Sequence, residues 1–480
     1  MTTRTHMTMT TRSTITGKLG ARAALARAAL ARAALALGAL VAAAALAAPA
    51  ARAQAQQTQQ TQSQNPNDAL LNTLVRKGVL TQQDAADLRA EVAKQQDQQP
   101  AAVPVIAGSK TDSAFVFSGR IQAQYANLVT TDADDLSDNV NNRVGRAFLR
   151  RIYLGVKASL GANWSANINY DFADSGSFDK AFIEWAGNLG NAPFAFDIGL
   201  RKVNFDYDEF TSSANLKCIE RSGASRYFAE NADGRKLGAA SYHIGLFADY
   251  NPNAFAGKTT GFFAGAALTN ADRQSAISEV SVQSNAVSNQ PAAWLNAGYS
   301  AKTDALSCIV GIAGAYLPRM GGLRASNGSM SPAGQNITEG DIYVDLTSGI
   351  FNIVAEYLVA KVDKGNLNAT TATVSGFWIQ PSVKLGKKWE LVARYSYTSS
   401  DGRGVRVSDG VRSAFSLGNA SVTAKALSDY YIGANYYIKG NDLKLQFGYV
   451  GGQTAGALLG AAALDKETVN GLRAQMQVNF

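Results

Sequence analysis

The sequence predicts an all-β fold: a transmembrane antiparallel β-barrel with a short helical periplasmic segment before it. Apolar and polar residues alternate along many segments between Phe115 and Phe480, short and long links alternate between these segments, and only 17% of the 480 residues are charged. In a bilayer every backbone polar group needs a partner within the protein, so strands cross only as a closed ring that is apolar outside and polar inside. A soluble β-sandwich also alternates, but its single core would have to hold repeated tyrosine-rich rows over this whole length.

Residues 1–53 have the features of a secretory signal peptide. They contain seven Arg or Lys residues and no acid, and an apolar run over 33–48 leads to Ala51-Arg52-Ala53, which fits an A-x-A cleavage site. A membrane anchor is the alternative, but a spanning helix needs about 20 strongly apolar residues, and this run is shorter and mostly alanine. Cleavage after Sec export would remove most of the formal net charge of +8, so the charge gives no support for a nucleic-acid partner.

Residues 54–114 separate the signal from the predicted barrel. Residues 54–67 and 96–114 are polar or proline-containing linkers. Between them, residues 68–95 are predicted to form a helical hairpin or a coiled-coil segment. Its apolar stripes at helical spacing include Leu70, Leu74, Leu88 and Val92. So short a unit needs a partner, which we expect to be a neighbouring subunit or another periplasmic surface; a solvated spacer with transient helicity is the alternative.

The predicted barrel covers residues 115–480 and has 16 strands, with 18 as the alternative. In the last strand, apolar residues stand at every second position from Leu472 to Phe480, with polar residues between them. Tight hairpin turns are expected at 161–163, 386–388 and 439–441. The strands are expected to begin near Phe115, Arg146, Asn163, Phe178, Phe194, Leu237, Thr260, Ala292, Ala305, Asp341, Ile350, Thr373, Trp389, Leu427, Asp442 and Glu467.

Several segments in the first third of this barrel carry a family resemblance. They are residues 146–156, 164–172, 180–185, 199–202, 211–213, 219–222 and 234–238. In their order and spacing they resemble the phosphate-selective porin O and P family of Gram-negative outer membranes. The carboxyl half resembles the family only in texture, and the terminal Phe480 resembles the barrel-assembly signal of outer-membrane proteins.

The resemblance implies a 16-stranded porin, commonly a homotrimer, that passes small anions and possibly phosphate across the outer membrane. The partners it implies are outer-membrane lipid and lipopolysaccharide, the barrel-assembly machinery, and small anions as solutes. No cofactor and no metal are expected. Two other functions stay open: a general non-selective small-solute porin, and a structural barrel that tethers the outer membrane.

Basic residues that alternation turns toward the barrel interior are candidates for pore lining. They are Arg120, Arg151, Lys157, Arg201, Lys384, Arg394, Lys444 and Arg473. A wide aqueous lumen screens charges within about 8 Å, so scattered cations alone would discriminate weakly between ions. The 33 basic and 31 acidic residues of 115–480 do not show an anion preference either. Selectivity therefore needs a narrow place.

The longest predicted link, residues 202–236, is the expected constriction, because in porins that the sequence resembles this loop folds into the barrel. Its candidate anion-contacting residues are Lys217, Arg221, Arg226, Arg235 and Lys236. Arginine offers two parallel N–H donors to an oxyanion. Alternatively, acids of the same loop pair with these groups and only hold the loop shut. Those acids are Asp206, Asp208, Glu209, Glu220, Glu230 and Asp233.

A second basic cluster, Arg403, Arg406 and Arg412, falls in a late long loop. Three interpretations are open for it: collection of anions at the outer mouth, binding of lipopolysaccharide phosphates, and a plain solvated loop.

The sequence gives no support for catalysis. His243 is the one histidine outside the signal, and no G-x-S-x-G sequence accompanies it. The acids are scattered and no His/Cys cluster suggests a metal site.

Overall fold

The fold is that of a computed structural model, in which the chain forms two units, Met1–Gln99 and Pro100–Phe480. The described residues are 83, 105–107, 113–132, 143–173, 176–230, 235–271, 290–324, 330–366, 370–414, 423–459 and 466–480. The predicted signal peptide, the first linker and, apart from Gln83, the predicted helical segment lie outside them. Among the described residues, no helix has both the length and the apolar composition needed to cross a membrane.

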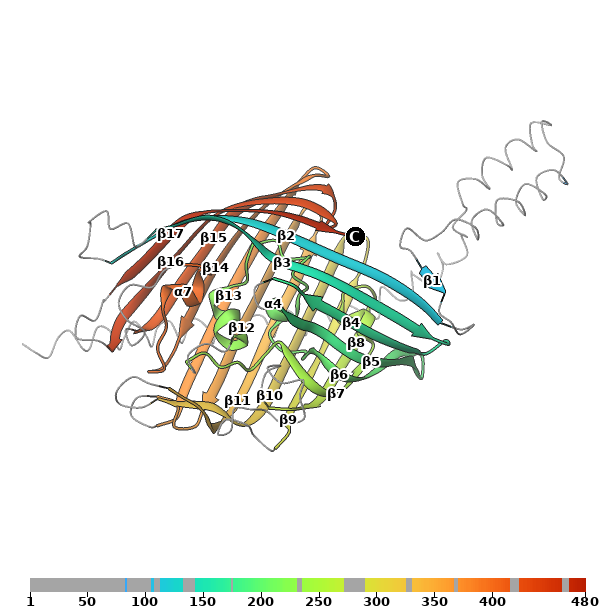
Figure 1. The fold of residues 1–480 in the computed structure, drawn as a ribbon, viewed down its shortest axis with the longest axis horizontal. Coiled ribbons are helices and arrows are strands. Elements are labelled where there is room, and N and C mark those ends of the chain that lie inside the picture. The colour runs from blue at the N-terminus through green and yellow to red at the C-terminus, as the bar shows by residue number, and fades with distance from the viewer. Residues whose placement is uncertain are drawn as a thin grey trace, which may run out of the picture. The chain divides into compact units, whose positions relative to one another are not determined.

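Sixteen antiparallel strands close into a barrel (Figure 1). The last strand pairs with the first, from Glu467 opposite Asp132 to Asn479 opposite Arg120. The strands are β2 (Ser113–Asp132), β3 (Arg143–Leu160), β4 (Trp164–Asp171), β5 (Ser177–Leu189), β6 (Ala192–Lys202), β7 (Tyr242–Tyr250), β8 (Gly261–Thr269), β9 (Ala292–Lys302), β10 (Leu306–Arg324), β11 (Met330–Ser348), β12 (Phe351–Val362), β13 (Ala372–Leu385), β14 (Trp389–Ser399), β15 (Thr423–Lys439), β16 (Leu443–Leu459) and β17 (Glu467–Asn479). A short strand, β1 (Val105–Ala107), pairs with the start of β2. The predicted 16-stranded barrel is confirmed.

Side chains alternate between the two faces of the wall. In β17, Leu472 is 59% exposed and Met476 is 47% exposed, whereas Arg473 and Gln475 are each 3% exposed. The same two-residue period runs through β12 and β14. In water, such apolar rows would cost about 25 cal/mol for each Å² left exposed, and in a bilayer lipid chains cover them.

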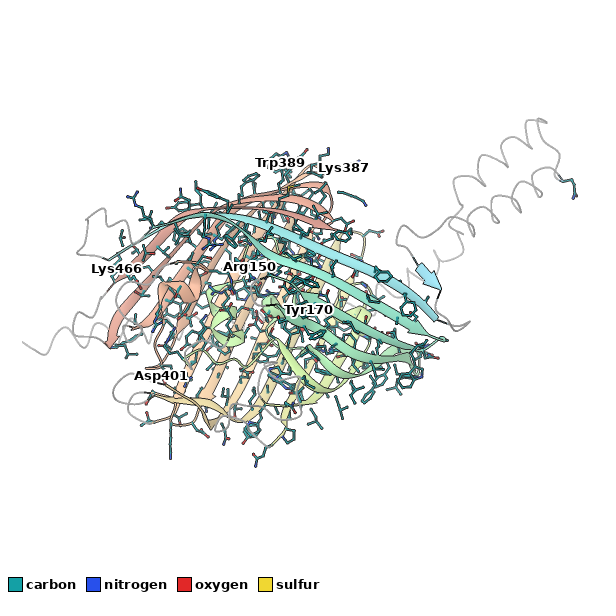
Figure 2. The ribbon with its side chains drawn as sticks, in the orientation of Figure 1. Arg150, Tyr170, Lys387, Trp389, Asp401 and Lys466 are labelled. Carbon is teal, nitrogen blue, oxygen red and sulfur yellow. The ribbon has the colours of Figure 1, made fainter. Side chains whose placement is uncertain are left out.

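Short and long links alternate around the barrel and lie at its two opposite ends. Trp389 and Lys387 mark the end with the short turns in Figure 2, and Asp401 and Lys466 mark the other end. Two of the predicted tight turns contain Gly386 with φ 68° and Gly440 with φ 52°, a left-handed conformation that glycine adopts at little cost. The longest short-end link holds a small helix, α6 (Pro252–Phe255).

Fourteen of the 16 predicted strand starts lie within four residues of the observed ones. The prediction for Leu237 is wrong because its backbone N–H donates to the Tyr227 carbonyl at 3.0 Å, which ties it to a folded loop, so the strand begins at Tyr242. The prediction for Asp341 is also wrong. Strand β11 begins at Met330, because a stretch without alternation pairs with the end of β10.

The long link between β6 and β7 folds back into the barrel. This inner loop, residues 203–241, contains α4 (Tyr207–Phe210) and α5 (Gly223–Ala229), and α5 packs on β12 to β15. A second inner segment, residues 400–414, carries α7 (Val407–Gly410) against α5. With the wall they form an apolar core inside the barrel, which includes Val203, Phe205, Tyr227, Phe228, Leu237, Trp294, Leu317, Leu358, Trp378, Val405 and Leu427. One side of the barrel interior is therefore filled.

Candidate functional site

A cavity of about 540 Å³ occupies the side of the barrel interior between the inner loop and strands β2 to β7. Its basic lining residues are Arg120, Arg150, Arg151, Lys180, Arg201, Lys202, Arg221, Arg226 and Arg412. Its acidic lining residues are Asp171, Asp179, Glu184, Asp197, Glu209, Glu230 and Asp249. Since the two sets nearly balance, the partners of each group decide which charges are available to a solute.

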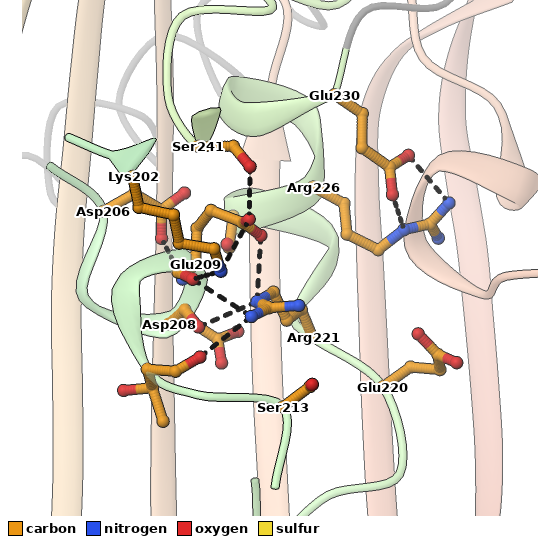
Figure 3. A network of polar contacts seen from close by, with 12 residues as sticks. Lys202, Asp206, Asp208, Glu209, Ser213, Glu220, Arg221, Arg226, Glu230 and Ser241 are labelled. Carbon is orange, nitrogen blue, oxygen red and sulfur yellow. Dashed lines mark hydrogen bonds and ion pairs between the residues drawn. The ribbon is translucent and has the colours of Figure 1, made fainter. Parts of the chain in front are cut away.

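Arg221 holds the inner loop in its folded shape (Figure 3). Its guanidinium donates to the carbonyl oxygens of Asp208 at 2.9 Å, Glu209 at 3.0 Å and Thr211 at 2.9 Å. It also lies 2.9 Å from the Glu209 carboxylate, which forms a second ion pair with Lys202 at 3.0 Å. Because these contacts use its N–H donors, Arg221 acts mainly within the loop. The alternative in which an acid of the same loop pairs with Arg221 therefore applies, and that acid is Glu209.

Two glutamates of the inner loop bind arginines from the wall and from the second inner segment. Glu220 lies 2.8 Å from Arg150 and 3.1 Å from Arg412. Glu230 pairs with Arg226 at 3.0 Å and also with Arg412. Burial alone would raise the pKa of Glu220, but Arg150 and Arg412 hold it well below its ordinary value. Both glutamates are therefore charged and paired at neutral pH.

The second inner segment is clamped onto the inner loop. Arg235 donates to Asp409 at 2.9 Å and 3.3 Å, and Lys236 lies 3.6 Å from the same carboxylate. Despite burial, these two cations lower the pKa of Asp409 to about 2. Arg403 is fully buried and donates to the Arg235 carbonyl at 3.1 Å. The interpretation of this cluster as a solvated loop or an outer-mouth site is wrong for Arg403 and for the cavity-lining Arg412.

Three lining cations have no carboxylate partner among the described residues. Arg120 donates to Ser213 at 2.6 Å and to Asn479 at 2.9 Å, and Arg151 donates to Gln122 at 2.7 Å. Lys180 is exposed within the cavity. These three cations are therefore held without a direct ion pair in the described part of the chain, although Asp179 lies near enough to Arg120, and Glu220 near enough to Arg151, for their charges to interact.

Every acid of the cavity, by contrast, accepts a hydrogen bond or an ion pair. The Asp171 carboxylate takes the backbone N–H groups of Ile152 and Ala173, each at 3.0 Å. Asp197 and Asp249 both pair with Arg201, the latter at 2.7 Å. Asp179 accepts hydrogen bonds from Asn169 and Tyr242. Glu184 pairs with Lys157 and accepts a hydrogen bond from Ser165. The ion pairs of Glu209 and Glu230 are given above.

The family model of the phosphate-selective porin O and P matches residues 117–303 and 324–480. The chain belongs to this family. It is an outer-membrane porin, a channel rather than an enzyme, and the resemblance seen in the sequence is confirmed. A comparison with curated proteins finds no match.

Several solved outer-membrane proteins are similar to this porin at low identity. An anion-selective porin from Comamonas acidovorans is 14% identical with a TM-score of 0.47, and the match covers 77% of this chain and 100% of that one. OprB of Pseudomonas putida is 10% identical with a TM-score of 0.48, covering 76% and 94%. The outer membrane channel DcaP of Acinetobacter baumannii is 13% identical with a TM-score of 0.45, covering 78% and 100%.

Six other predicted residues lie inside the barrel but are held by the inner loop or its neighbours. Lys444 is fully buried and donates to the carbonyls of Ala214 at 2.7 Å and Leu216 at 2.9 Å. Arg394 donates to the Glu220 carbonyl at 2.8 Å. Lys217, Arg473, Arg235 and Lys236 are likewise held, the first by Glu390 at 2.8 Å and the second by Gln124 at 3.1 Å. Alternation predicts whether the side chain of a strand residue points into the barrel, but it does not predict which loop residues bury that side chain.

The remaining predicted lumen residues do not line the cavity. Lys157 pairs with Glu184 at 3.3 Å, close to the 161–163 turn. Lys384 is exposed near the 386–388 turn. Of the predicted set, the structure brings together Arg120, Arg151, Arg201, Arg221 and Arg226 around one cavity.

The sequence analysis missed Arg150 and Lys180, and it placed Arg412 in a separate cluster of a late loop rather than in the cavity. Arg150 enters the barrel because Gln122 pairs with Arg151 and the next residue, Ala123, pairs with Leu149. This bulge places two consecutive arginines on the inner side, a break in alternation that the sequence does not signal. Lys180 obeys the alternation with Phe182 and Glu184, so the pattern could have found it.

A cluster of carboxyl groups with no basic partner among the described residues holds the start of the inner loop. It consists of Asp206, Glu339, Asp341 and Glu356 and is called the carboxyl cluster below. Backbone N–H groups of Asp206 and Tyr207 donate to Asp341 at 2.7 Å and to Glu356 at 2.5 Å. Neither carboxylate oxygen of the buried Glu339 has a hydrogen-bond partner in the described part of the chain. Burial, followed by the nearby charges of Asp208 and Glu209, raises the pKa of the loop residue Asp206 well above its ordinary value.

Proposed function

We propose that this porin passes small anions through the cavity beside the inner loop. The observation that carries the proposal is the charge of the lining, in which nine basic side chains face seven acidic ones. Arg120, Arg151 and Lys180 form no ion pair with a carboxylate among the described residues, whereas only two lining acids, Asp171 and Asp179, form none with a cation there. A cavity wall with an excess of positive charge concentrates anions and repels cations. Arg150, which pairs with Glu220, and Arg412, which pairs with Glu220 and Glu230, add further N–H donors to the cavity lining.

The inner loop and the second inner segment together narrow this path. Both segments fold into the barrel, and Arg412 and Arg226 line the cavity from them. A narrowed, partly dry passage strengthens the contact between a solute and the wall charges, which a wide lumen would screen. Phosphate, the solute in the family's name, is one anion that the cavity is proposed to accept.

Replacing Arg120, Arg151 and Lys180 together with glutamine is expected to lower the anion preference. A unit charge at about 4 Å in water contributes about 1 kcal/mol, so the chloride-to-potassium permeability ratio should fall about fivefold or more. The measurement is the reversal potential of the refolded protein in planar bilayers under a KCl gradient. Lys387→Gln, in an exposed turn, is the matched control and should leave the ratio unchanged.

The same recording separates the proposal from its alternatives. A wild-type channel that conducts without preferring chloride would show a general small-solute porin. A folded barrel without any current would favour the structural tether.

We further propose that the porin is a homotrimer and that residues 68–95 assist its assembly through their apolar stripes. Deleting residues 54–110 is expected to weaken the trimer on native gels while the barrel still folds, because the deleted stripes lie outside the barrel strands. Trimers of undiminished stability in the deleted protein would count against a role for this segment.

Export and insertion complete the proposed function. A cleaved Sec signal at 1–53 would deliver the chain to the barrel-assembly machinery, which would read Phe480. The backbone of this residue exchanges hydrogen bonds with Gly119 at 2.7 Å and 3.0 Å, and its ring covers that glycine. The side chain of Phe480 is 64% exposed on the outside of the barrel, where a receptor can reach it. Lipid and lipopolysaccharide would surround the apolar outer rows.

A further inference from the structure

Aromatic rings, as well as charges, line the cavity of the porin. They are Tyr153, Phe178, Phe182, Phe210, Tyr242 and Phe255, and each is partly exposed. An exposed ring in a water-filled passage costs free energy in proportion to its apolar area. A pore for small hydrated ions has no use for such surface, so the rings point to a solute with an apolar part.

The rings lie beside the cations that lack carboxylate partners. Arg120 is directly opposite Tyr153 in the pairing of β2 with β3, and its guanidinium lies 5.2 Å from the ring centre. Lys180 and Phe182 stand two residues apart on β5, facing Asn169 and Asn167 of β4. A cation and a ring therefore adjoin each other at two places on the same wall.

A second pair of rings adds apolar surface to the same cavity. Phe210, at the end of α4, packs against Phe255 of α6 with ring centres 4.4 Å apart. Both residues line the cavity together with Tyr153 and Phe182. A solute in this cavity would therefore meet both cations and rings.

We propose that the preferred solute class is an organic carboxylate with an apolar, and preferably aromatic, body. This inference rests on the proposed function, since it names the class of anion that the cavity favours. The carboxylate binds the guanidinium of Arg120 or Arg151 through paired N–H donors, and the body packs on Tyr153 and Phe182. Phosphate and chloride gain nothing from the rings, because the face of an aromatic ring carries negative potential. The cavity volume suits a small organic molecule.

The test is block of the chloride current through single channels by benzoate, acetate and phosphate at equal concentration and pH. Benzoate should reach half-block at about one tenth of the acetate concentration, and phosphate should block no better than acetate. Cyclohexanecarboxylate, which has the apolar body without the ring electrons, should fall between benzoate and acetate. Phosphate or acetate blocking as well as benzoate would overturn the inference.

Substitutions in the wall locate the effect. Tyr153→Thr with Phe182→Thr should bring the half-block concentration of benzoate to that of acetate, both measured relative to the variant's own open-channel chloride current. Asn167→Thr, opposite Phe182 on the neighbouring strand, is the matched control and should keep the preference. A double variant that still prefers benzoate tenfold would remove these rings from the proposal.

The outcomes distinguish this inference from the proposed function. If the wild-type channel shows no chloride preference under a KCl gradient, the anion proposal itself fails. If it prefers chloride but does not distinguish benzoate from acetate, the anion proposal stands and the inference about the organic body fails.

Discussion

Replacing Arg221 with alanine is expected to loosen the inner loop and to raise the single-channel conductance of the porin. The guanidinium satisfies three backbone carbonyls and the Glu209 carboxylate, all in the first half of the loop. Without it, a buried carboxylate loses one of its two cations, and breaking a buried pair in this way costs about 3–5 kcal/mol. The carbonyls that lose a donor add to this cost. The first turn of the loop should therefore leave its docked position for much of the time.

Two measurements check this expectation. Planar-bilayer recordings should show a larger and noisier open current with a weaker ion preference. A protease added to the purified protein should cut the inner loop of the variant faster than that of the wild type. Arg221→Lys keeps the positive charge near Glu209 but loses the several N–H donors of the guanidinium, so its current and its cleavage rate should lie between those of the wild type and of Arg221→Ala.

Arg146→Ala is the matched control for this experiment. Arg146 is an exposed arginine of β3, and among the described residues its side chain makes no contact with the inner loop. Its removal should change neither the current nor the cleavage. Wild-type currents from a folded Arg221→Ala protein would show that the loop is held without this residue.

The barrel could be predicted because its signal is local. A strand that faces lipid on one side and water on the other must alternate, so the sequence from Leu472 to Phe480 reports its own environment. The strand starts could also be predicted wherever the alternating pattern begins at the first residue of the strand. Where the chain pairs beyond the alternating part, as at Met330, or packs on a loop, as at Leu237, the local pattern carries no information about the partner.

The cavity could be predicted only in part. Arg120 and Arg151 follow from alternation, and the structure places both in the lining. Arg150 depends on a bulge. Arg412 depends on the second inner segment, which brings it to Glu220 from 192 residues further along the chain. Such contacts are set by tertiary packing, so a single sequence does not display them. The same holds for Lys444: its orientation toward the barrel interior was predicted, but its burial by the inner loop was not.

Raising the pH through the raised pKa of Asp206 is expected to release the start of the inner loop reversibly. The carboxyl cluster has no ion pair among the described residues, and the pKa of Asp206 lies well above its ordinary value because the site is buried and close to Asp208 and Glu209. A carboxyl whose pKa is raised in the docked state stabilises docking while it is protonated. That contribution is complete below the ordinary pKa of about 4 and is lost as the pH rises through the raised value.

The groups that surround Asp206 support this sign. The titratable side chains near Asp206 on α4 and β11 are carboxyls or tyrosine hydroxyls, and the nearest one on β12 is Glu356. The nearby cations form ion pairs with Asp208 and Glu209. The charged and titratable neighbours are Tyr207, Asp208, Glu209, Arg221, Lys202, Arg394, Glu339, Asp341, Tyr343 and Glu356. Ionisation of the cluster therefore adds like charges in a buried place, and the loop gains by moving away.

Asp206→Asn isolates the effect of this one proton. Asparagine keeps the side-chain oxygen that accepts the Glu209 N–H at 3.0 Å, and it tolerates the positive φ of 64° at this position. The wild-type current should rise and become noisier as the pH is raised through the pKa of Asp206 and return on acidification, whereas the variant should respond less. Asp304→Asn, in the exposed turn between β9 and β10, should behave as the wild type. A wild-type current that stays constant from acidic to strongly alkaline pH would show that the carboxyl cluster keeps the loop docked whether or not Asp206 is protonated, which the burial of Asp206 argues against.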